Sequence, residues 1–212
     1  MDVNKLELYL VTDSCLANGR DLVGIVIKAV EGGVTMVQLR EKAADTRTFL
    51  SRGQELKQAL HKYGIPLIIN DRIDIALAID ADGVHIGQSD MPYETARRLL
   101  GKDKIIGLSV ENINEALEAN NLDVDYIGIS PVFATPTKTD TAMPFGLDGL
   151  ARAVRMSVHP TVAIGGMNEG TAAETIARGT DGIAVVSAIV TAASPREAAS
   201  RLLKIIDDER RV

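Results

Sequence analysis

The 212-residue sequence is poor in aromatic side chains, with three Phe, four Tyr and no Trp. Proteins that bind single-stranded nucleic acids stack the bases on such rings, so this scarcity argues against that class of partner. An excess of basic residues is missing as well, because 23 Lys and Arg stand against 29 Asp and Glu, for a formal net charge of -6. We therefore expect no nucleic-acid partner, and a small-molecule partner is favoured.

Cysteine and long apolar runs are also scarce. The single cysteine, Cys15, excludes an intramolecular disulfide framework, and with no histidine near it in sequence a small apolar residue is a simpler interpretation than a nucleophile. No apolar run reaches the roughly 18 residues of a membrane helix, and the start MDVNKLELYL lacks the pattern of a signal peptide. We expect a cytoplasmic protein without a membrane partner; a homo-oligomer is compatible with the sequence but not specified by it.

Two patterns alternate along the chain. Short β-branched or aliphatic segments predict eight strands, which start at Leu6, Thr35, Pro66, Gly83, Lys104, Asp125, Thr161 and Gly182. Longer amphipathic segments predict eight helices, over residues 22–31, 46–62, 73–79, 92–100, 113–120, 147–156, 169–178 and 195–210. Asp45 is placed to cap the second of these helices and Gly64 to end it.

This alternation predicts an α/β fold with a parallel sheet and right-handed crossovers. Eight repeats in 212 residues favour one closed (β/α)8 barrel, a TIM barrel, over an open doubly wound sheet. No linker, charge block or low-complexity segment divides the chain, so residues 1–212 are predicted to form a single domain.

Barrel enzymes carry their chemistry at the C-terminal ends of the strands and in the loops that follow. Polar residues and glycines gather at these positions, namely Gln38, Arg40, Lys42, Asn70, Asp71, His85, Gln88, Asp90, Ser109, Ser130, Gly165, Gly166 and Ser187. The connection after the sixth strand is unusually long and contains ATPTKTDT at 134–141. Connections beyond ~12 residues are commonly functional or disordered, so we expect this one to belong to the site.

The segment VQLREK places Gln38, Arg40 and Lys42 two residues apart, so they project from one face if the segment is extended. A buried arginine at the end of an apolar strand needs an anion, which a phosphate-bearing ligand would supply. The structural alternative is that Lys42 lies in the loop while Gln38 and Arg40 satisfy each other.

Asp71 and Asp90 follow neighbouring strands and are predicted to share one rim of the barrel. Two carboxylates can hold Mg²⁺ through one or two direct oxygens, leaving other positions to water and substrate phosphate. Alternatively, each caps the helix that follows it. A second anion site is predicted at Gly165, Gly166 and Ser187, because the loops after strands seven and eight often bind phosphate; the glycine pair by itself is also typical of a tight turn.

The three histidines give little support to hydrolytic chemistry. His61 and His159 are expected at the opposite end of the barrel, in structural roles, while His85 lies inside the fourth strand and suits either a hydrogen-bonded core position or catalysis. No Ser, His and Asp arrangement and no His or Cys metal cluster is evident in the sequence.

In this order, the segments QLREK, IINDR, DGVHIGQSD, GLS, SPVFATPTKTD, AIGG and VVSAI resemble those of the thiamine-phosphate synthases, from about Leu8 to Ala188. The resemblance implies a (β/α)8 barrel that joins a hydroxymethylpyrimidine diphosphate to a thiazole phosphate, giving thiamine phosphate and pyrophosphate with Mg²⁺. It implies pyrimidine-diphosphate contacts from Gln38, Arg40, Lys42, Asn70, Ser109 and Lys138. It also implies Mg²⁺ ligands at Asp71 and Asp90, and thiazole-phosphate contacts from Thr135, Thr137, Gly165 or Gly166, Val186 and Ser187.

The mechanism that this resemblance implies needs no protein nucleophile. Pyrophosphate leaves first, and the thiazole nitrogen attacks the pyrimidine cation. Mg²⁺, Arg40, Lys42 and Lys138 suit the stabilisation of the leaving group, and Ser109 belongs to the same predicted catalytic set. Many family members have a histidine just after that serine, whereas this chain reads SVEN at 109–112.

Three other functions remain open on the sequence. A thiazole tautomerase of the same superfamily is expected to use a histidine at the start of the sixth loop, where this chain has SPVF at 130–133. Another phosphate-binding barrel, such as a sugar-phosphate isomerase or epimerase, would act without the pyrimidine diphosphate. A ligand-binding regulator would bind both substrates without forming a product.

Overall fold

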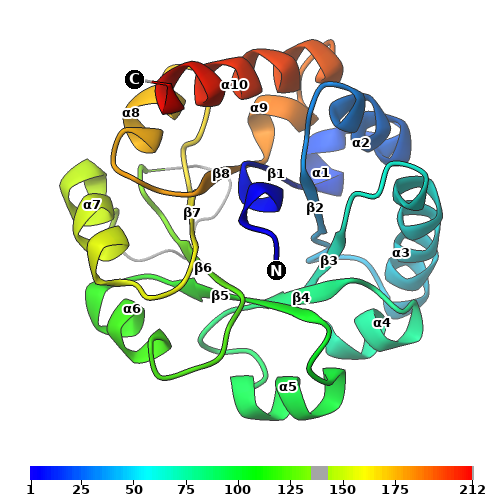
Figure 1. Ribbon diagram of the computed structural model, residues 1–212. Helices are drawn as coiled ribbons and strands as arrows, with labels where there is room; N and C mark the ends of the chain where they lie inside the picture. Colours follow the sequence, from blue (N-terminus) through cyan, green and yellow to red (C-terminus); the bar gives the residue numbers. More distant parts are fainter. Residues whose placement is uncertain (135–142, 212) are drawn as a thin grey trace.

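The computed structural model describes residues 1–134 and 143–211. Thr135, Thr137 and Lys138, three of the predicted site residues, lie outside the described residues. Eight parallel strands close into a barrel in sequence order (Figure 1), which confirms the predicted α/β (β/α)8 barrel. They are β1 (Leu8–Val11), β2 (Met36–Leu39), β3 (Leu67–Asn70), β4 (Gly83–Ile86), β5 (Ile105–Val110), β6 (Tyr126–Ile129), β7 (Thr161–Ile164) and β8 (Gly182–Val185).

Helices form a ring outside these strands (Figure 1). Those matching the predicted amphipathic segments are α2 (Leu22–Glu31), α3 (Thr46–His61), α4 (Ile73–Ala78), α5 (Tyr93–Leu100), α6 (Ile113–Ala119), α7 (Gly146–Met156), α8 (Ala172–Ile176) and α10 (Pro195–Arg210). Three short elements were not predicted: the 3-10 helix η1 (Val3–Leu6), α1 (Ser14–Ala17) and α9 (Ser187–Val190).

Local hydrogen bonds explain where two of the helices begin. The Asp45 carboxylate accepts the backbone N–H of Thr48 at 2.9 Å, which confirms the predicted cap of α3. Helix α8 was predicted over 169–178 but begins only at Ala172. The reason is a turn closed by Asn168, whose side chain accepts the N–H of Gly170 at 2.8 Å.

The strands are buried on both faces, as expected for a parallel barrel. In β1, Leu8 and Leu10 pack against the helices, whereas Tyr9 and Val11 face the interior. The interior cluster consists of Leu6, Tyr9, Val11, Met36, Ile68, Tyr126, Val162 and Ala184. Side chains therefore fill the barrel, and a ligand can be bound only at one of its mouths.

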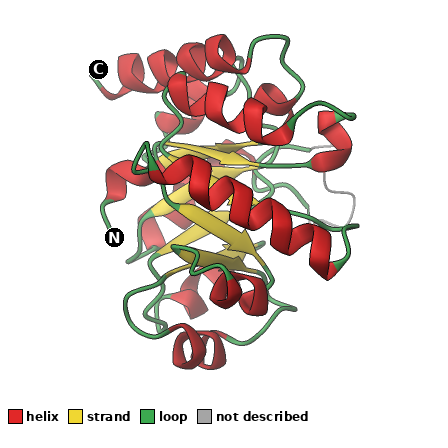
Figure 2. Cartoon of the chain, turned by 90° about the vertical axis from the view of Figure 1, so that its right-hand side faces the viewer, coloured by secondary structure: helices red, strands yellow, loops and turns green. Residues whose placement is uncertain are grey.

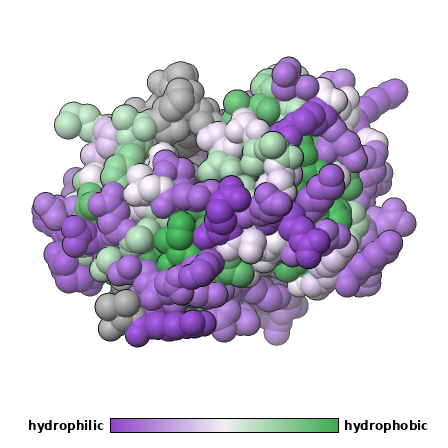
Figure 3. Space-filling view, turned by 90° about the horizontal axis from the view of Figure 1, so that it is seen from above, coloured by the Kyte–Doolittle hydropathy of each residue, from purple (hydrophilic) through white to green (hydrophobic). Residues whose placement is uncertain are grey.

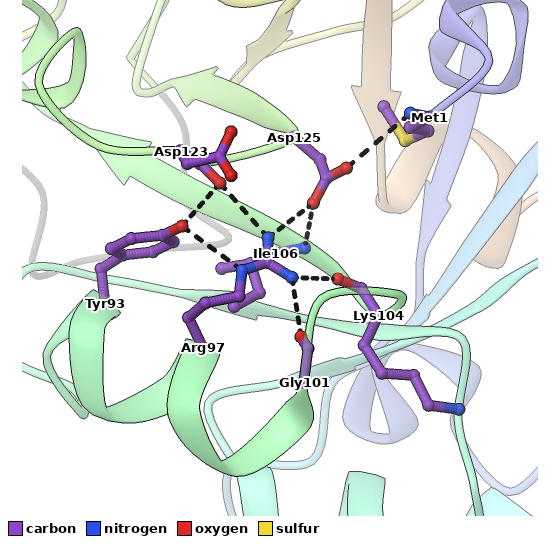
Figure 4. Close-up of polar contacts among 8 residues, drawn as sticks. All are labelled: Met1, Tyr93, Arg97, Gly101, Lys104, Ile106, Asp123 and Asp125. Carbon is purple, nitrogen blue, oxygen red and sulfur yellow. Dashed lines mark hydrogen bonds and ion pairs between the residues drawn. The ribbon is translucent and has the colours of Figure 1, made fainter.

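The two ends of the barrel differ. In Figure 2 the strand arrows point toward one end of the molecule, and the N-terminus lies at the other. At that N-terminal end, Arg97 of α5 donates to the carbonyl oxygens of Gly101 and Lys104 and to the carboxylate of Asp125, at 3.1, 2.6 and 3.0 Å (Figure 4). The same carboxylate oxygen accepts the N–H of Ile106 at 2.9 Å, so one guanidinium joins α5 to the starts of β5 and β6.

The outer surface seen in Figure 3 is mostly hydrophilic, with small separated hydrophobic areas. Of the helices in the described ranges, none combines the length and the apolar character needed to cross a membrane.

Candidate active site

A cavity of about 470 Å³ opens at the mouth formed by the C-terminal ends of the strands. Its size is within the usual range of small-molecule sites. The predicted residues that line it are Gln38, Arg40, Asn70, His85, Ser109, Ser130, Gly165, Gly166, Val186 and Ser187. The fold thus collects into one pocket residues that are almost 150 positions apart in sequence.

Arg40 stands one residue beyond β2 and is held by the end of β1. Its backbone N–H donates to the hydroxyl of Thr12 at 3.1 Å, and its guanidinium lies 3.4 Å from the carboxylate of Asp13. A neighbouring carboxylate thus satisfies part of the anion requirement that the sequence predicts, while Arg40 still lines the pocket.

The three polar residues of VQLREK do not share one strand face. Only Gln38 lies within β2, where it is buried, and Lys42 lies in the loop with its side chain 57% exposed. The alternative that placed Lys42 in the loop is right on that point. Its second part, a pairing of Gln38 with Arg40, is wrong, because Gln38 donates to the hydroxyl of Tyr9 at 2.8 Å.

Asp71 and Asp90 follow the C-terminal ends of β3 and β4, on the rim of the barrel beside the residues that line the cavity, and neither caps a helix. The carboxylate of Asp71 is 2.8 Å from the amino group of Lys42, and that of Asp90 accepts the N–H of Gly87 at 2.7 Å. Helices α4 and α5 start without a side-chain cap, so the capping alternative is wrong for both residues. Asp71 also has a φ of 61°, in the left-handed region that aspartate tolerates better than most residues.

The two carboxylates of Asp71 and Asp90 lie close together, and a cation between them would relieve their repulsion. Burial raises the pKa of Asp90, and the neighbouring carboxylate of Asp71 raises it further. Within the described ranges, no cluster of three or more His, Cys, Asp or Glu side chains is arranged to hold a metal. A pair of carboxylates nevertheless matches the donor set of Mg²⁺, which usually keeps several waters and substrate phosphate as further ligands.

Gly165 and Gly166 form a tight turn at the end of β7, with φ of 96° and 73°. A Cβ atom at Gly165 would lie 2.8 Å from Cβ of Pro131, and one at Gly166 would lie 2.7 Å from Cβ of Phe133. The turn interpretation therefore holds, and glycine is required for the close approach of the loop after β6. Both residues also line the pocket, so the same backbone segment forms the tight turn and is placed for the predicted phosphate binding.

Ser187, which we expected just after the last strand, is the first residue of a short helix. β8 ends at Val185, and Ser187 is the first residue of α9, with Val186 in the capping position. The first N–H groups of a helix have no partner within it and carry partial positive charge. Val186 and Ser187 thus bring donors of the kind that bind anions to the edge of the pocket.

His85 is 5% exposed, and both of its ring nitrogens have hydrogen-bond partners within the site. Its Nδ1 lies 3.0 Å from the hydroxyl of Tyr126 and its Nε2 lies 2.8 Å from the hydroxyl of Ser109. Tyr9 and Tyr126 were not predicted to belong to the site; the available signal was a tyrosine at an inward position of an otherwise apolar strand. Gln88 reaches the same area, donating to the carbonyl oxygen of Ser109 at 2.7 Å.

The remaining candidates lie away from the pocket. His159 is 3.0 Å from the carbonyl oxygen of Ala119, and His61 borders a separate cavity of about 130 Å³ near the start of β3. Cys15 is exposed on α1 and does not pack in the core, contrary to its interpretation as a small apolar residue.

Comparison with known proteins decides the family. A family model described as "Thiamine monophosphate synthase" matches residues 8–189. The chain belongs to the thiamine monophosphate synthase family. This confirms the resemblance that its sequence segments show, and the chain is accordingly an enzyme, a transferase.

Curated members of the thiamine monophosphate synthase family resemble the chain over nearly its full length. A "Thiamine-phosphate synthase" of Albidiferax ferrireducens is 55% identical over 202 residues, which cover 95% of this chain and 92% of the relative. A protein of the same name from Vibrio parahaemolyticus is 53% identical over 97% of this chain and 100% of its own.

Solved structures agree with this family. A thiamine phosphate pyrophosphorylase from Pyrococcus furiosus has a TM-score of 0.90 and 42% identity, with 98% of each chain covered. A 3-hexulose-6-phosphate synthase, at 18% identity and a TM-score of 0.71, shares the fold alone.

Proposed function

We propose that this member of the family condenses a hydroxymethylpyrimidine diphosphate with a thiazole phosphate, giving thiamine phosphate and pyrophosphate. The observation that carries the proposal is the single pocket in which Gln38, Arg40, Asn70 and Ser109 face the turn at Gly165 and the start of α9. The names of the two curated relatives support the same reaction. One side of the pocket suits a diphosphate and the other a single phosphate.

In this proposal Asp71 and Asp90 hold Mg²⁺, which supplies positive charge beside the diphosphate when it is bound. The amino group of Lys42 lies 2.8 Å from the carboxylate of Asp71, so a cation and a carboxylate meet at this rim. Lys42 and Arg40 then offer N–H donors to the diphosphate oxygens. The predicted contribution of Lys138 lies outside the described residues and stays a prediction.

The reaction requires one bond to break and another to form. The bond from the pyrimidine methylene carbon to the diphosphate oxygen breaks, and its electron pair leaves with pyrophosphate. The nitrogen of the thiazole then donates its lone pair to the cationic carbon. Arg40 and Lys42 stabilise the negative charge that develops on the leaving group.

The thiazole tautomerase alternative has weaker support. Its expected histidine, at the start of the loop after β6, is replaced here by Ser130 and Pro131, which follow β6 directly. The polar residues expected for the pyrimidine diphosphate border the cavity instead, including Gln38, Asn70 and Ser109.

The direct test is an assay of the full chain with both phosphorylated substrates and Mg²⁺, measuring thiamine phosphate and pyrophosphate. Omitting each component in turn separates the alternatives. The proposal expects equal amounts of the two products, and only in the complete mixture. Turnover of the thiazole phosphate alone would instead support a tautomerase, and binding of both substrates without product would support a regulator.

A further inference from the structure

A chain of hydrogen bonds crosses the interior of the barrel and ends on two residues of the pocket. Gln38 Nε2 donates to the Tyr9 hydroxyl at 2.8 Å, and that hydroxyl lies 2.9 Å from the hydroxyl of Tyr126. The Tyr126 hydroxyl lies 3.0 Å from His85 Nδ1. His85 Nε2 lies 2.8 Å from the Ser109 hydroxyl. The chain thus links five strands and joins Gln38 to Ser109 beneath the ligand cavity.

The backbone around this chain is built to accommodate it. Tyr9 and Tyr126 are both fully buried, with their rings edge to face and the centroids 6.0 Å apart. A Cβ atom at Gly107 of β5 would lie 2.1 Å from the ring of Tyr126, and one at Gly128 of β6 would lie 3.1 Å from the ring of His85. These strand glycines leave room for the two rings, as expected where side chains must approach a strand closely.

The direction of the donors along the chain follows from counting hydrogens. Gln38 uses an amide hydrogen on Tyr9, so the single Tyr9 hydrogen points to Tyr126 and the Tyr126 hydrogen points to His85 Nδ1. His85 must then carry its hydrogen on Nε2 and donate to Ser109. The hydrogen of Ser109 is left for a ligand, and the amide oxygen of Gln38 is left to accept from one.

A doubly protonated His85 would break this order. Its Nδ1–H would point at Tyr126, whose hydrogen would turn to Tyr9, and Tyr9 would then receive two donors with no acceptor for its own buried hydrogen among the described residues. Such an unmade hydrogen bond is unfavourable in a buried site. Burial raises the pKa of both tyrosines well above the ordinary value, so both keep their hydrogens.

We propose that Tyr9 and Tyr126 are positioning residues, which act through His85 and Gln38 to make Ser109 a donor and Gln38 an acceptor in the pocket. The inference rests on the proposed function, because it names the groups of the pyrimidine diphosphate that the pocket recognises. A ligand that fits is an aminopyrimidine, with an amino group facing Gln38 and an acceptor atom facing Ser109.

The first test measures the tautomer of His85 directly and does not depend on catalytic activity. Imidazole ¹⁵N NMR spectra are recorded on the full chain, with the three histidines assigned through His61→Gln and His159→Gln. The expected result is a neutral His85 protonated on Nε2 in the parent protein, and a mixture of tautomers in Tyr126→Phe. A parent His85 protonated on Nδ1 or on both nitrogens, or a Tyr126→Phe spectrum like that of the parent, would overturn the proposal.

The second test separates positioning from folding. Tyr9→Phe and Tyr126→Phe are each expected to lower kcat about tenfold, the loss typical of one strong hydrogen bond, with an unchanged KM for the thiazole phosphate. The double variant should lose no more than about the larger single loss, because the residues act as a unit. Tyr63→Phe, at an exposed tyrosine, is the matched control and should match the parent.

The outcomes of this second test are distinct. Losses that multiply in the double variant, or kcat values equal to those of Tyr63→Phe, would overturn the inference. If Tyr126→Phe fails to fold, Tyr9→Phe and the parent tautomer decide it. A parent protein that forms no product contradicts the proposed function, and the tautomer measurement then still tests the hydrogen-bond chain.

Discussion

Asp13 uses its two carboxylate oxygens for different purposes. One accepts the N–H of Leu16 at 2.9 Å and caps α1, and the other lies 3.4 Å from the guanidinium of Arg40. A contact of 3.4 Å is long for a charged pair, so Asp13 orients the guanidinium of Arg40 without fully occupying it. Arg40, which is proposed to bind the diphosphate, is thus held by Asp13, a residue that was not predicted as part of the site.

Replacing Asp13 by Asn tests this division of roles. Asparagine caps a helix about as well as aspartate but carries no charge, so Asp13→Asn should keep the melting temperature close to that of the parent. We expect kcat/KM for the pyrimidine diphosphate to fall by about threefold to tenfold, as for the loss of one ordinary hydrogen bond. Asp21→Asn, at a helix start without a side-chain cap, is the control. Unchanged kinetics would contradict the role given to Asp13.

Asp90 is the sharper test of the proposed Mg²⁺ site. Asp90→Asn removes one of two carboxylates, so the Mg²⁺ concentration for half-maximal rate should rise at least about tenfold, as when the shell of a metal site is disturbed. Asp208→Asn, at an exposed position of α10, should leave it unchanged. The measurement is a Mg²⁺ titration of initial rates. Equal titration curves for the two variants would exclude Asp90 as a ligand.

At the scale of elements, Arg97 joins α5 to β5 and β6 at the end of the barrel opposite the pocket (Figure 4). Arg97→Met keeps much of the aliphatic length but removes all of these donors. We expect the free energy of unfolding to fall by about 1.5 to 3 kcal/mol, because the partly buried acceptors at Lys104 and Asp125 lose a charged partner. Denaturant unfolding measures the loss of stability. When kcat is measured at a temperature well below the melting temperature, it should stay at the parent value. A kcat that falls with stability intact would contradict the separation of the two ends.

Long elements were predictable and short ones were not. All eight strands lie within or next to their predicted segments, because burial on both faces leaves an apolar run that is easily recognised. Helices α1 and α9 have four residues each, too few to show a periodicity. The late start of α8 depends on a side-chain turn at Asn168, which competes with the helix and leaves no mark in the hydrophobic pattern.

At the scale of the whole molecule, the barrel topology made most of the site predictable. Once the strands are assigned, their C-terminal ends must meet at one mouth, so residues as distant as Gln38 and Ser187 were expected together and do line one pocket. The pairing of Tyr9 with Tyr126 was not predictable, because it depends on strand register and on hydrogen bonds across 117 positions. The roles of Thr135, Thr137 and Lys138 stay predictions, outside the described residues.

The central claim is that condensation takes place in this one pocket, with the diphosphate and the single phosphate on opposite sides. A crystal structure of the chain with thiamine phosphate, pyrophosphate and Mg²⁺ tests it most directly. We predict pyrophosphate beside Arg40 and Lys42, Mg²⁺ in contact with Asp71 or Asp90, and the other phosphate at the turn of Gly165 and the start of α9. Either ligand bound outside this cavity, or Mg²⁺ that touches neither carboxylate, would contradict the account.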